Sequence, residues 1–384
     1  MCQRFLVLQI SIAVLLAACS QDPEVEFASE IRVKEHLTIG LEEHENDILG
    51  GVRAILADSE RNIFIADPTI PAIRVFDSSG RWKSDIGRLG EGPVEFASLH
   101  TIEKIKGDTL LAVDGAAMRA TAISADEGYL DSWPLVTVKN GFLMPWSMHP
   151  LGDGRFLVQG EHVISTNPLD DHPLYMFHIV SREQSGYRIL ESFFDRKDAL
   201  GHSDFGLAWP SNGSIAQLDE HSFLYSPQLY EGQLYFIHYN QKNDSWEKVD
   251  RWEGVVKSDE SYELVTEDDY PGHNVTLAGS PSGTFFARIF NRSSGLFYVE
   301  NDKILHFTRI RVNGKEQFGI ETFNLSGELI NYGRIYTRDY PEEPSSNPHV
   351  DYLDKHGRFY VRDEEFSTGA PIVRVIELKN SKRE

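Results

Sequence analysis

The stretch Val52–Ile86, VRAILADSERNIFIADPTIPAIRVFDSSGRWKSDI, decides the fold of this chain. Short β-rich runs alternate in it with Asp, Asn, Ser and Gly turn residues, and Asp67 closes the second run. This pattern is typical of short strands joined by tight turns. Four strands are predicted, at Val52–Ala57, Ile63–Ala66, Ile73–Phe76 and Arg81–Ile86.

The same order of strands and turns returns further along the chain. The repeated strands are Thr101–Ile105, Thr109–Val113, Met118–Ile123 and Tyr129–Trp133. Asp67 and Asp114 end equivalent strands 47 positions apart, and Gly80 and Gly128 lie 48 positions apart. A four-stranded unit with a period in the forties is the signature of propeller blades.

Fainter copies bring the total to six. The second strand recurs in Phe156–Val158, in His221–Tyr225 and in Arg358–Asp363. In the fifth copy it is either Thr284–Ile289 or Ile304–Ile310, and the sequence leaves both alternatives open.

The sixth copy ends after its third strand, Ile372–Leu378, while Ile31–Ile39 is an unpaired strand at the N-terminus. Pairing the two would close the ring and remove two exposed sheet edges. The predicted fold is therefore all-β: a six-bladed β-propeller of four-stranded antiparallel blades, closed by an N-terminal strand.

Two features carry a family resemblance over roughly residues 50–130. The first two copies resemble NHL-repeat blades. Gly90–Phe96, GEGPVEF, resembles the Gly-x-Gly-Pro-Gly-Glu-Phe linker of bacterial six-bladed propeller lipoproteins, a family without an established activity. This chain has Val94 where that pattern has glycine, and a glycine there implies a positive φ.

The N-terminus predicts export. Phe5–Ala18 is a mostly apolar run that follows Arg4, and it is shorter than the ~20 residues of a spanning helix. Leu16-Ala17-Ala18-Cys19 resembles a bacterial lipobox. The resemblance implies a cleaved signal peptide (1–18), a lipid-anchored tether beginning at Cys19 (19–30) and a propeller domain (31–384). An ordinary secretory signal that ends in cysteine is the alternative.

The residue after the lipobox cysteine bears on the location. Ser20 stands where an aspartate would retain a lipoprotein at the inner membrane. The predicted location is therefore the cell envelope, lipid-anchored to the outer membrane on its periplasmic or surface face.

Composition restricts the partners. The net charge of −22 argues against nucleic acid as a partner and against binding to anionic lipid head groups, so membrane contact is expected through the anchor only. The two cysteines are Cys2 and Cys19, so the exported domain has no disulfide and must rest on a sizeable core.

The chain contains no Gly-x-Ser-x-Gly, P-loop or His-Glu-x-x-His motif. Asp67, Asp114 and Asp363 recur at one position of their copies, which favours carboxylates that cap turns over metal ligands.

One set of candidate site residues emerges when the copies are superposed. Fourteen positions before the end of each second strand lies the start of the innermost strand, where side chains approach the central channel. The six residues at this position are Arg53, His100, Trp146, Asn212, Asn274 and His349, with Ser294 in place of Asn274 in the other fifth-blade alternative. His149 is a further channel candidate. Around a closed ring, His100 and His349 would flank Arg53, and the trio could bind a carboxylate or phosphate.

Two classes of function follow. The leading hypothesis is a binding module without a catalytic motif, whose partner is an unknown protein or a small anionic ligand and which needs no cofactor; one variant is a sensor domain of an envelope complex. The alternative is a channel-site hydrolase or lactonase with a divalent cation, Ca²⁺. The absence of carboxylates from the six positions argues against it. A different strand register would supply Asp351, Glu103 and Asp58.

Overall fold

The computed structural model describes residues 29–379, with gaps at 42–44, 125–127, 136, 139–140, 165–174, 185, 196–197, 199–212, 257–260, 267, 269–274, 281–282, 313–314, 337–347 and 366. The predicted leader and tether (1–30) therefore lie almost entirely outside the described residues. No helix among the described residues has the length and apolar character needed to cross a membrane.

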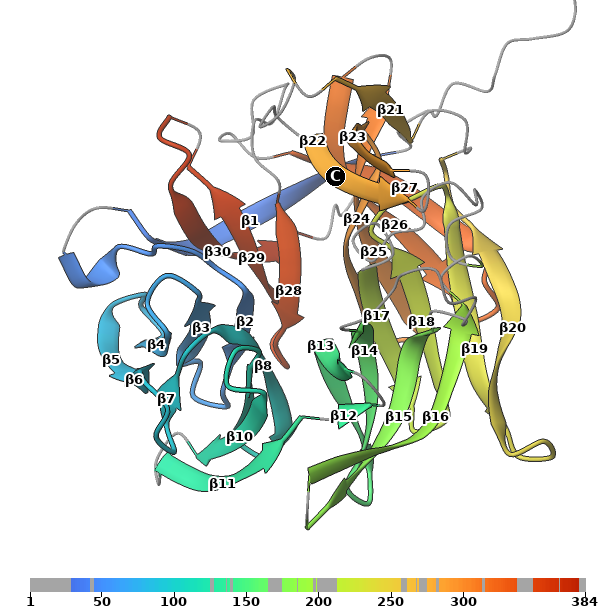
Figure 1. Ribbon diagram of the computed structural model, residues 1–384. Helices are drawn as coiled ribbons and strands as arrows, with labels where there is room; N and C mark the ends of the chain where they lie inside the picture. Colours follow the sequence, from blue (N-terminus) through green and yellow to red (C-terminus); the bar gives the residue numbers. More distant parts are fainter. Residues whose placement is uncertain are drawn as a thin grey trace, which may run out of the picture.

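Blades 1 and 2 follow the predicted repeat (Figure 1). Blade 1 consists of β2 (Ala54–Ala57), β3 (Ile63–Asp67), β4 (Ala72–Phe76) and β5 (Trp82–Ile86). Blade 2 consists of β8 (Leu99–Lys106), β9 (Thr109–Asp114), β10 (Arg119–Ser124) and β11 (Gly128–Pro134). Each strand pairs antiparallel with the next, so the eight predicted strands are confirmed.

The glycine-rich linker joins these two blades. Its ends form the short parallel pair β6 (Arg88–Leu89) and β7 (Glu95–Phe96). The Glu95 carboxylate accepts hydrogen bonds from the Gly92 N–H and from Arg88 Nε, both at 2.8 Å. Positive φ angles occur at Gly87 (88°) and Gly90 (154°) and not at Val94, so the valine fits without backbone strain.

Blades 3 and 4 follow in the ring. Blade 3 has a short extra strand at its edge and consists of β12 (Thr137–Val138), β13 (Gly141–Gly152), β14 (Arg155–Ile164), β15 (Tyr175–Glu183) and β16 (Gly186–Asp195). Blade 4 consists of β17 (Gly213–Asp219), β18 (Ser222–Pro227), β19 (Gln233–Asn240) and β20 (Ser245–Glu253).

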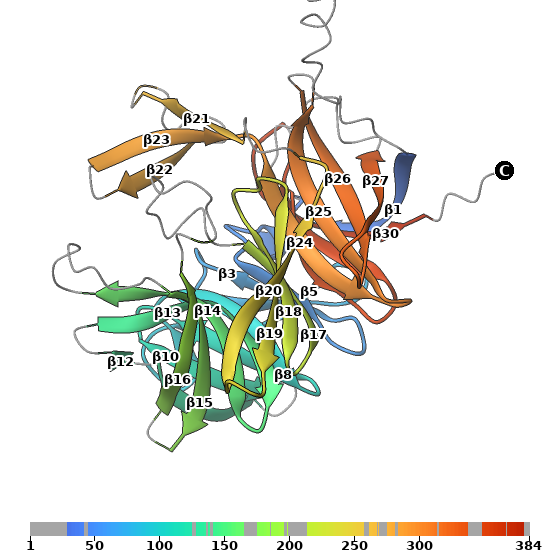
Figure 2. The same cartoon turned by 90° about the vertical axis from the view of Figure 1, so that its right-hand side faces the viewer.

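The strands of blade 5 decide between the two alternatives for its second strand. It consists of β24 (Arg292–Val299), β25 (Lys303–Val312), β26 (Lys315–Asn324) and β27 (Leu329–Tyr336), so Ile304–Ile310 belongs to its second strand. The competing segment lies in a separate sheet of β21 (Tyr262–Val265), β23 (Gly283–Ile289) and β22 (Val275–Ser280). Figure 2 shows this small sheet standing apart from the blades.

Blade 6 is completed by the N-terminal strand, as predicted. Its own strands are β28 (His349–Leu353), β29 (Arg358–Glu364) and β30 (Pro371–Leu378). The strand β1 (Ser29–Ile39) pairs antiparallel with β30 and also, through Ser29–Arg32, in parallel with β27 of blade 5. A single 3₁₀ turn, η1 (Glu45–Asp47), follows it.

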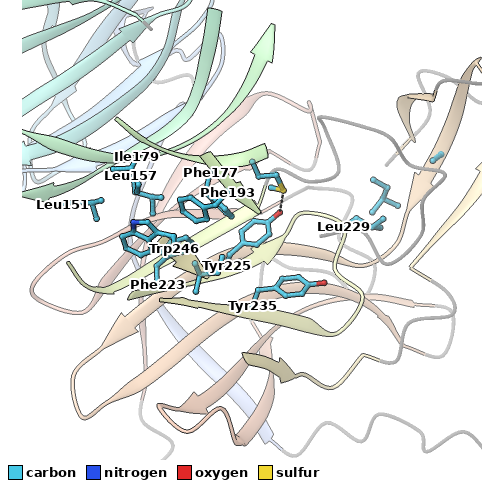
Figure 3. Packing of buried hydrophobic residues seen from close by; sticks show 14 residues of the cluster. Leu151, Leu157, Phe177, Ile179, Phe193, Phe223, Tyr225, Leu229, Tyr235 and Trp246 are labelled. Atoms are coloured by element: carbon cyan, nitrogen blue, oxygen red, sulfur yellow. Dashed lines mark hydrogen bonds between the residues drawn. The ribbon is translucent and has the colours of Figure 1, made fainter. Parts of the chain in front are cut away.

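The core is divided among the blade interfaces, because the middle strands of a blade are buried on both faces, as in β3 and β4. Six apolar clusters lie between neighbouring blades, including the one between blades 6 and 1. Figure 3 shows the cluster of blades 3 and 4, where Phe193 stacks on Trp246 at 5.7 Å and Phe177 meets Tyr225 edge-on at 5.0 Å.

The recurring aspartates act through hydrogen bonds within the protein. The buried Asp67 carboxylate accepts from the backbone N–H groups of Gly50 and Thr69, both at 2.9 Å. Asp114 accepts from four backbone N–H groups at 2.7–3.1 Å. Asp363 instead accepts from its neighbour Glu364 and from Arg374. The first two therefore cap the turns after their strands and fix the segments that lead into their own blades.

Ring closure by β1 can be tested at Ile39, which is 2% exposed and packs between blades 6 and 1. We expect Ile39→Ala to lower the free energy of unfolding by about 2–5 kcal/mol, because it opens a cavity in that interface. Urea unfolding followed by tryptophan fluorescence measures the change. Lys34→Ala on the exposed side of the same strand is the control, with an expected change of about 0.5 kcal/mol or less. Equal effects of the two variants would contradict the closure role of β1.

Candidate functional site

A single cavity gathers residues from the first strands of the blades. Its volume is about 370 Å³, within the range of small-molecule sites. Arg53 precedes β2, His100 lies on β8, Trp146 on β13 and His349 on β28, and all four line it. Equivalent positions around the ring thus converge on one space.

The remaining predicted positions have different outcomes. Asn212 and Asn274 lie outside the described residues, although Gly213, beside Asn212, lines the cavity. The fifth-blade alternative that went with Asn274 is wrong, because its second strand, β23, belongs to the separate sheet. Ser294 on β24 lines the cavity instead, as the other alternative predicted.

The lining residues outside the predicted set include Gln159, Arg292, Arg309 and Arg362. Three of these are on second strands, and their cross-strand partners are lining residues on first strands: Gln159 pairs with Ser147, Arg309 with Arg292 and Arg362 with His349. Superposition of one position per blade could not find them. A polar residue near the end of an otherwise apolar second strand is the sequence signal that could have done so.

The positive charge of the cavity comes from its arginines. Burial, followed by the neighbouring Arg53, lowers the pKa of His100. Burial, followed by Arg362, lowers the pKa of His349 to about 3, and its Nδ1–H donates to the Ser294 carbonyl at 2.9 Å. Both imidazoles are therefore neutral at pH 7. They offer hydrogen bonds, while Arg53, Arg292, Arg309 and Arg362 supply charge.

Two of the arginines pair with acidic groups that are not part of the lining. Arg309 forms an ion pair with Glu316, and Arg362 Nε lies 3.4 Å from the Asp351 carboxylate. No carboxylate is among the described residues that line the cavity.

Gln159 and Trp146 complete the wall with different chemistry. Gln159 is 3% exposed, and its Nε2 has no hydrogen-bond partner among the described residues. A buried amide donor without a partner costs free energy, which a ligand oxygen would recover. Trp146 presents an aromatic ring, which meets His100 edge-on at 5.8 Å.

Two of the three alternative carboxylates interact with each other. Burial raises the pKa of Glu103 to about 8; the Met148 N–H bonded to it opposes this shift, and nearby Asp351 adds to it. Burial raises the pKa of Asp351 to about 6, against the effect of Arg362. Asp58 does not join them, because it accepts hydrogen bonds from Glu60 and Asn62 within its own hairpin turn. The alternative prediction that all three carboxylates cluster is therefore wrong.

Metal-ligating side chains are sparse around this cavity. Within the described part of the chain, no three His, Cys, Asp or Glu side chains stand close enough to hold one ion. His149, the further channel candidate, instead hydrogen-bonds Ser147 Oγ through Nε2 at 3.1 Å, and burial lowers its pKa to about 4.

Comparisons with known proteins agree with this architecture. Residues 17–118 match the DUF5128 family, described as a 6-bladed beta-propeller. A DUF4221 family member from Bacteroides vulgatus aligns with a TM-score of 0.55 over 92% of this chain and 99% of its own, at 10% identity. A candidate exported protein from Bacteroides fragilis aligns with a TM-score of 0.51 over 90% and 95%, at 13% identity. A comparison with curated proteins found no significant match.

At these identities the structural likeness concerns the fold. The chain is a six-bladed β-propeller, and the predicted resemblance to bacterial proteins of this fold is confirmed. The NHL-type blades, the lipid anchor and the ligand-binding role of the cavity residues remain predictions.

The raised pKa of Glu103 predicts a pH-dependent stability. The folded state holds a proton on Glu103 up to about pH 8, while the unfolded chain releases it near pH 4.5, so this group makes stability fall as pH rises between those values. Glu103→Gln keeps an acceptor for Met148 N–H but cannot ionise. We expect its stability relative to the unmodified protein to increase from pH 5 to pH 8 in urea unfolding. A difference that is constant with pH would contradict the prediction.

Proposed function

We propose that this protein is a lipid-anchored propeller of the cell envelope that binds a small anionic ligand in the cavity between its blades. The observation that carries the proposal is the lining: four arginines and two histidines face about 370 Å³, without a carboxylate among the described lining residues. Planar guanidinium groups bind carboxylate and phosphate through paired hydrogen bonds.

The contrast with the rest of the molecule supports this proposal. The chain carries a net charge of −22, so its surface as a whole repels anions and nucleic acid. Cationic side chains that converge on a concave site against this background favour a specific local role over general surface charge. The buried Gln159 amide adds a donor for a ligand oxygen, and Trp146 adds an apolar face for an organic ligand.

A calcium-dependent hydrolase remains the alternative, and it would rely on Glu103 and Asp351. Their raised pKa values mean that both give up a proton less readily than ordinary carboxyl groups. Ca²⁺ usually requires six to eight oxygen ligands, including ionised carboxylates. The raised pKa values of Glu103 and Asp351 therefore favour an anion site over a calcium site. We propose no cofactor for the anion site.

The anion site is tested by the double variant Arg53→Ala with His100→Ala. Isothermal titration with inorganic phosphate and with citrate measures binding. We expect the variant to bind at least about tenfold more weakly, because it loses a charged and a neutral donor. Its circular dichroism should be unchanged. Arg188→Ala is the matched control for charge, because Arg188 is exposed on the outer hairpin of blade 3, where it pairs with Glu183. Unchanged binding by the double variant would contradict the proposal.

The anchor is tested at the lipobox cysteine. Cys19→Ser removes the thiol that would carry the lipid, so we expect the protein to move from the membrane fraction to the soluble fraction in a bacterial host with lipoprotein processing. Cys2→Ser is the matched control, because Cys2 lies inside the predicted signal peptide and should leave fractionation unchanged. Membrane association that survives Cys19→Ser would contradict a lipid anchor.

A further inference from the structure

A chain of three hydrogen-bonded side chains runs from the interior of blade 5 to the cavity wall. His306 Nε2 lies 3.0 Å from Ser293 Oγ, and His306 Nδ1 lies 2.8 Å from Glu321 Oε2. Ser293 lines the cavity, whereas His306 and Glu321 are fully buried behind it. A serine, a histidine and a carboxylate linked in this order make up the catalytic unit of serine hydrolases.

The carboxylate is held rigidly. Glu321 Oε1 accepts the Val255 N–H at 2.7 Å, and Oε2 accepts the Tyr230 hydroxyl at 2.6 Å. Gly254 provides the space, because a Cβ at that position would lie 1.9 Å from the Tyr230 hydroxyl oxygen and 2.4 Å from Glu321 Oε1. Glu321 therefore cannot move away from His306 without breaking its contacts between blades 4 and 5.

This arrangement sets the hydrogen on the imidazole. Glu321 Oε2 accepts from Nδ1 in the tautomer that carries its hydrogen there, and Nε2 then presents its lone pair to Ser293. Ser293 Oγ also donates to Ser214 Oγ at 3.1 Å. Rotation of the Ser293 hydroxyl turns its hydrogen toward His306 Nε2, 3.0 Å away, which is the geometry that proton transfer to histidine requires.

A bulge in β24 and two neighbouring arginines define the surroundings of Ser293 in the cavity wall. β24 has a bulge between Ser293 and Gly295, and such bulges redirect side chains at functional sites. Arg292 precedes the serine, and Arg309 is paired with Arg292 across the ladder; both line the same cavity. Ser293 and these two arginines therefore line one cavity.

We propose that Ser293, His306 and Glu321 form a serine hydrolase site that cleaves esters carrying a second, anionic group. Only the preference for an anionic group rests on the proposed anion site; the hydrolytic unit does not. Ser293 and His306 are the catalytic residues, and Glu321 is a positioning residue.

The reaction balances without a cofactor. Ser293 Oγ attacks the ester carbonyl carbon while its proton passes to His306 Nε2. The C–O bond to the alcohol breaks, and the departing alkoxide takes that proton, leaving an acyl-serine. Water then attacks the acyl carbon, giving a proton to His306. The Ser293 oxygen leaves and recovers the proton, and a carboxylic acid is released.

The site is tested with a fluorophosphonate probe, which phosphonylates an activated serine and expels fluoride. The full-length protein is incubated with the probe, and the modified peptide is identified by mass spectrometry. We expect one adduct on Ser293, which Ser293→Ala and His306→Gln abolish. Ser78→Ala is the matched control: it removes a hydroxyl from an exposed turn of blade 1, outside the cavity and the hydrogen-bonded chain, so labelling should persist.

Hydrolysis gives the second readout. We expect release of 4-nitrophenol from 4-nitrophenyl hydrogen succinate to exceed that from neutral 4-nitrophenyl butyrate. Ser293→Ala should lower the rate at least about 10³-fold. No adduct on Ser293 in the folded protein would overturn the proposal and leave the three residues as a structural link between blades 4 and 5. If labelling persists in the Arg53→Ala, His100→Ala variant while anion binding is unchanged, the anion site fails and the hydrolytic site stands.

Discussion

The structure depends on the need of every blade to bury both of its faces. An apolar sheet with two buried faces has no stable position at the end of a row, so the row must close into a ring. The cluster between blades 6 and 1 closes it, and Ile39 of β1 lies in that cluster. Because β1 also pairs with β27, one strand from the start of the chain fastens both of the last blades.

Closure also determines where polar groups can be placed. The first strands of all blades approach the same axis, so one polar residue per blade is enough to build a concave site, and cross-strand partners enlarge it. The arginines of blades 5 and 6 enter in this way, opposite Arg292 and His349. The buried network of Tyr230, Glu321 and His306 crosses between blades 4 and 5. Through His306, this network is hydrogen-bonded to Ser293, which lines the cavity.

The repeat predicted most of the fold, because blade strands are short, local and separated by distinctive turns. The fifth blade was ambiguous for a physical reason. Thr284–Ile289 and Ile304–Ile310 have the same strand-like composition, and only pairing with distant strands decides which one joins the ring. The same mistake moved the predicted ring position from Ser294 to Asn274. Residues such as Glu321 and His306 could not be predicted, because their importance comes from contacts across strands and not from position along one strand.

The anion site is tested most directly by a crystal structure of the protein soaked in selenate, with anomalous scattering used to locate the selenium. We expect an anion inside the cavity, within hydrogen-bond distance of at least two of Arg53, Arg292, Arg309 and Arg362. Selenate bound only on the outer surface, or a cation held by Glu103 and Asp351 in the channel, would contradict an anion site.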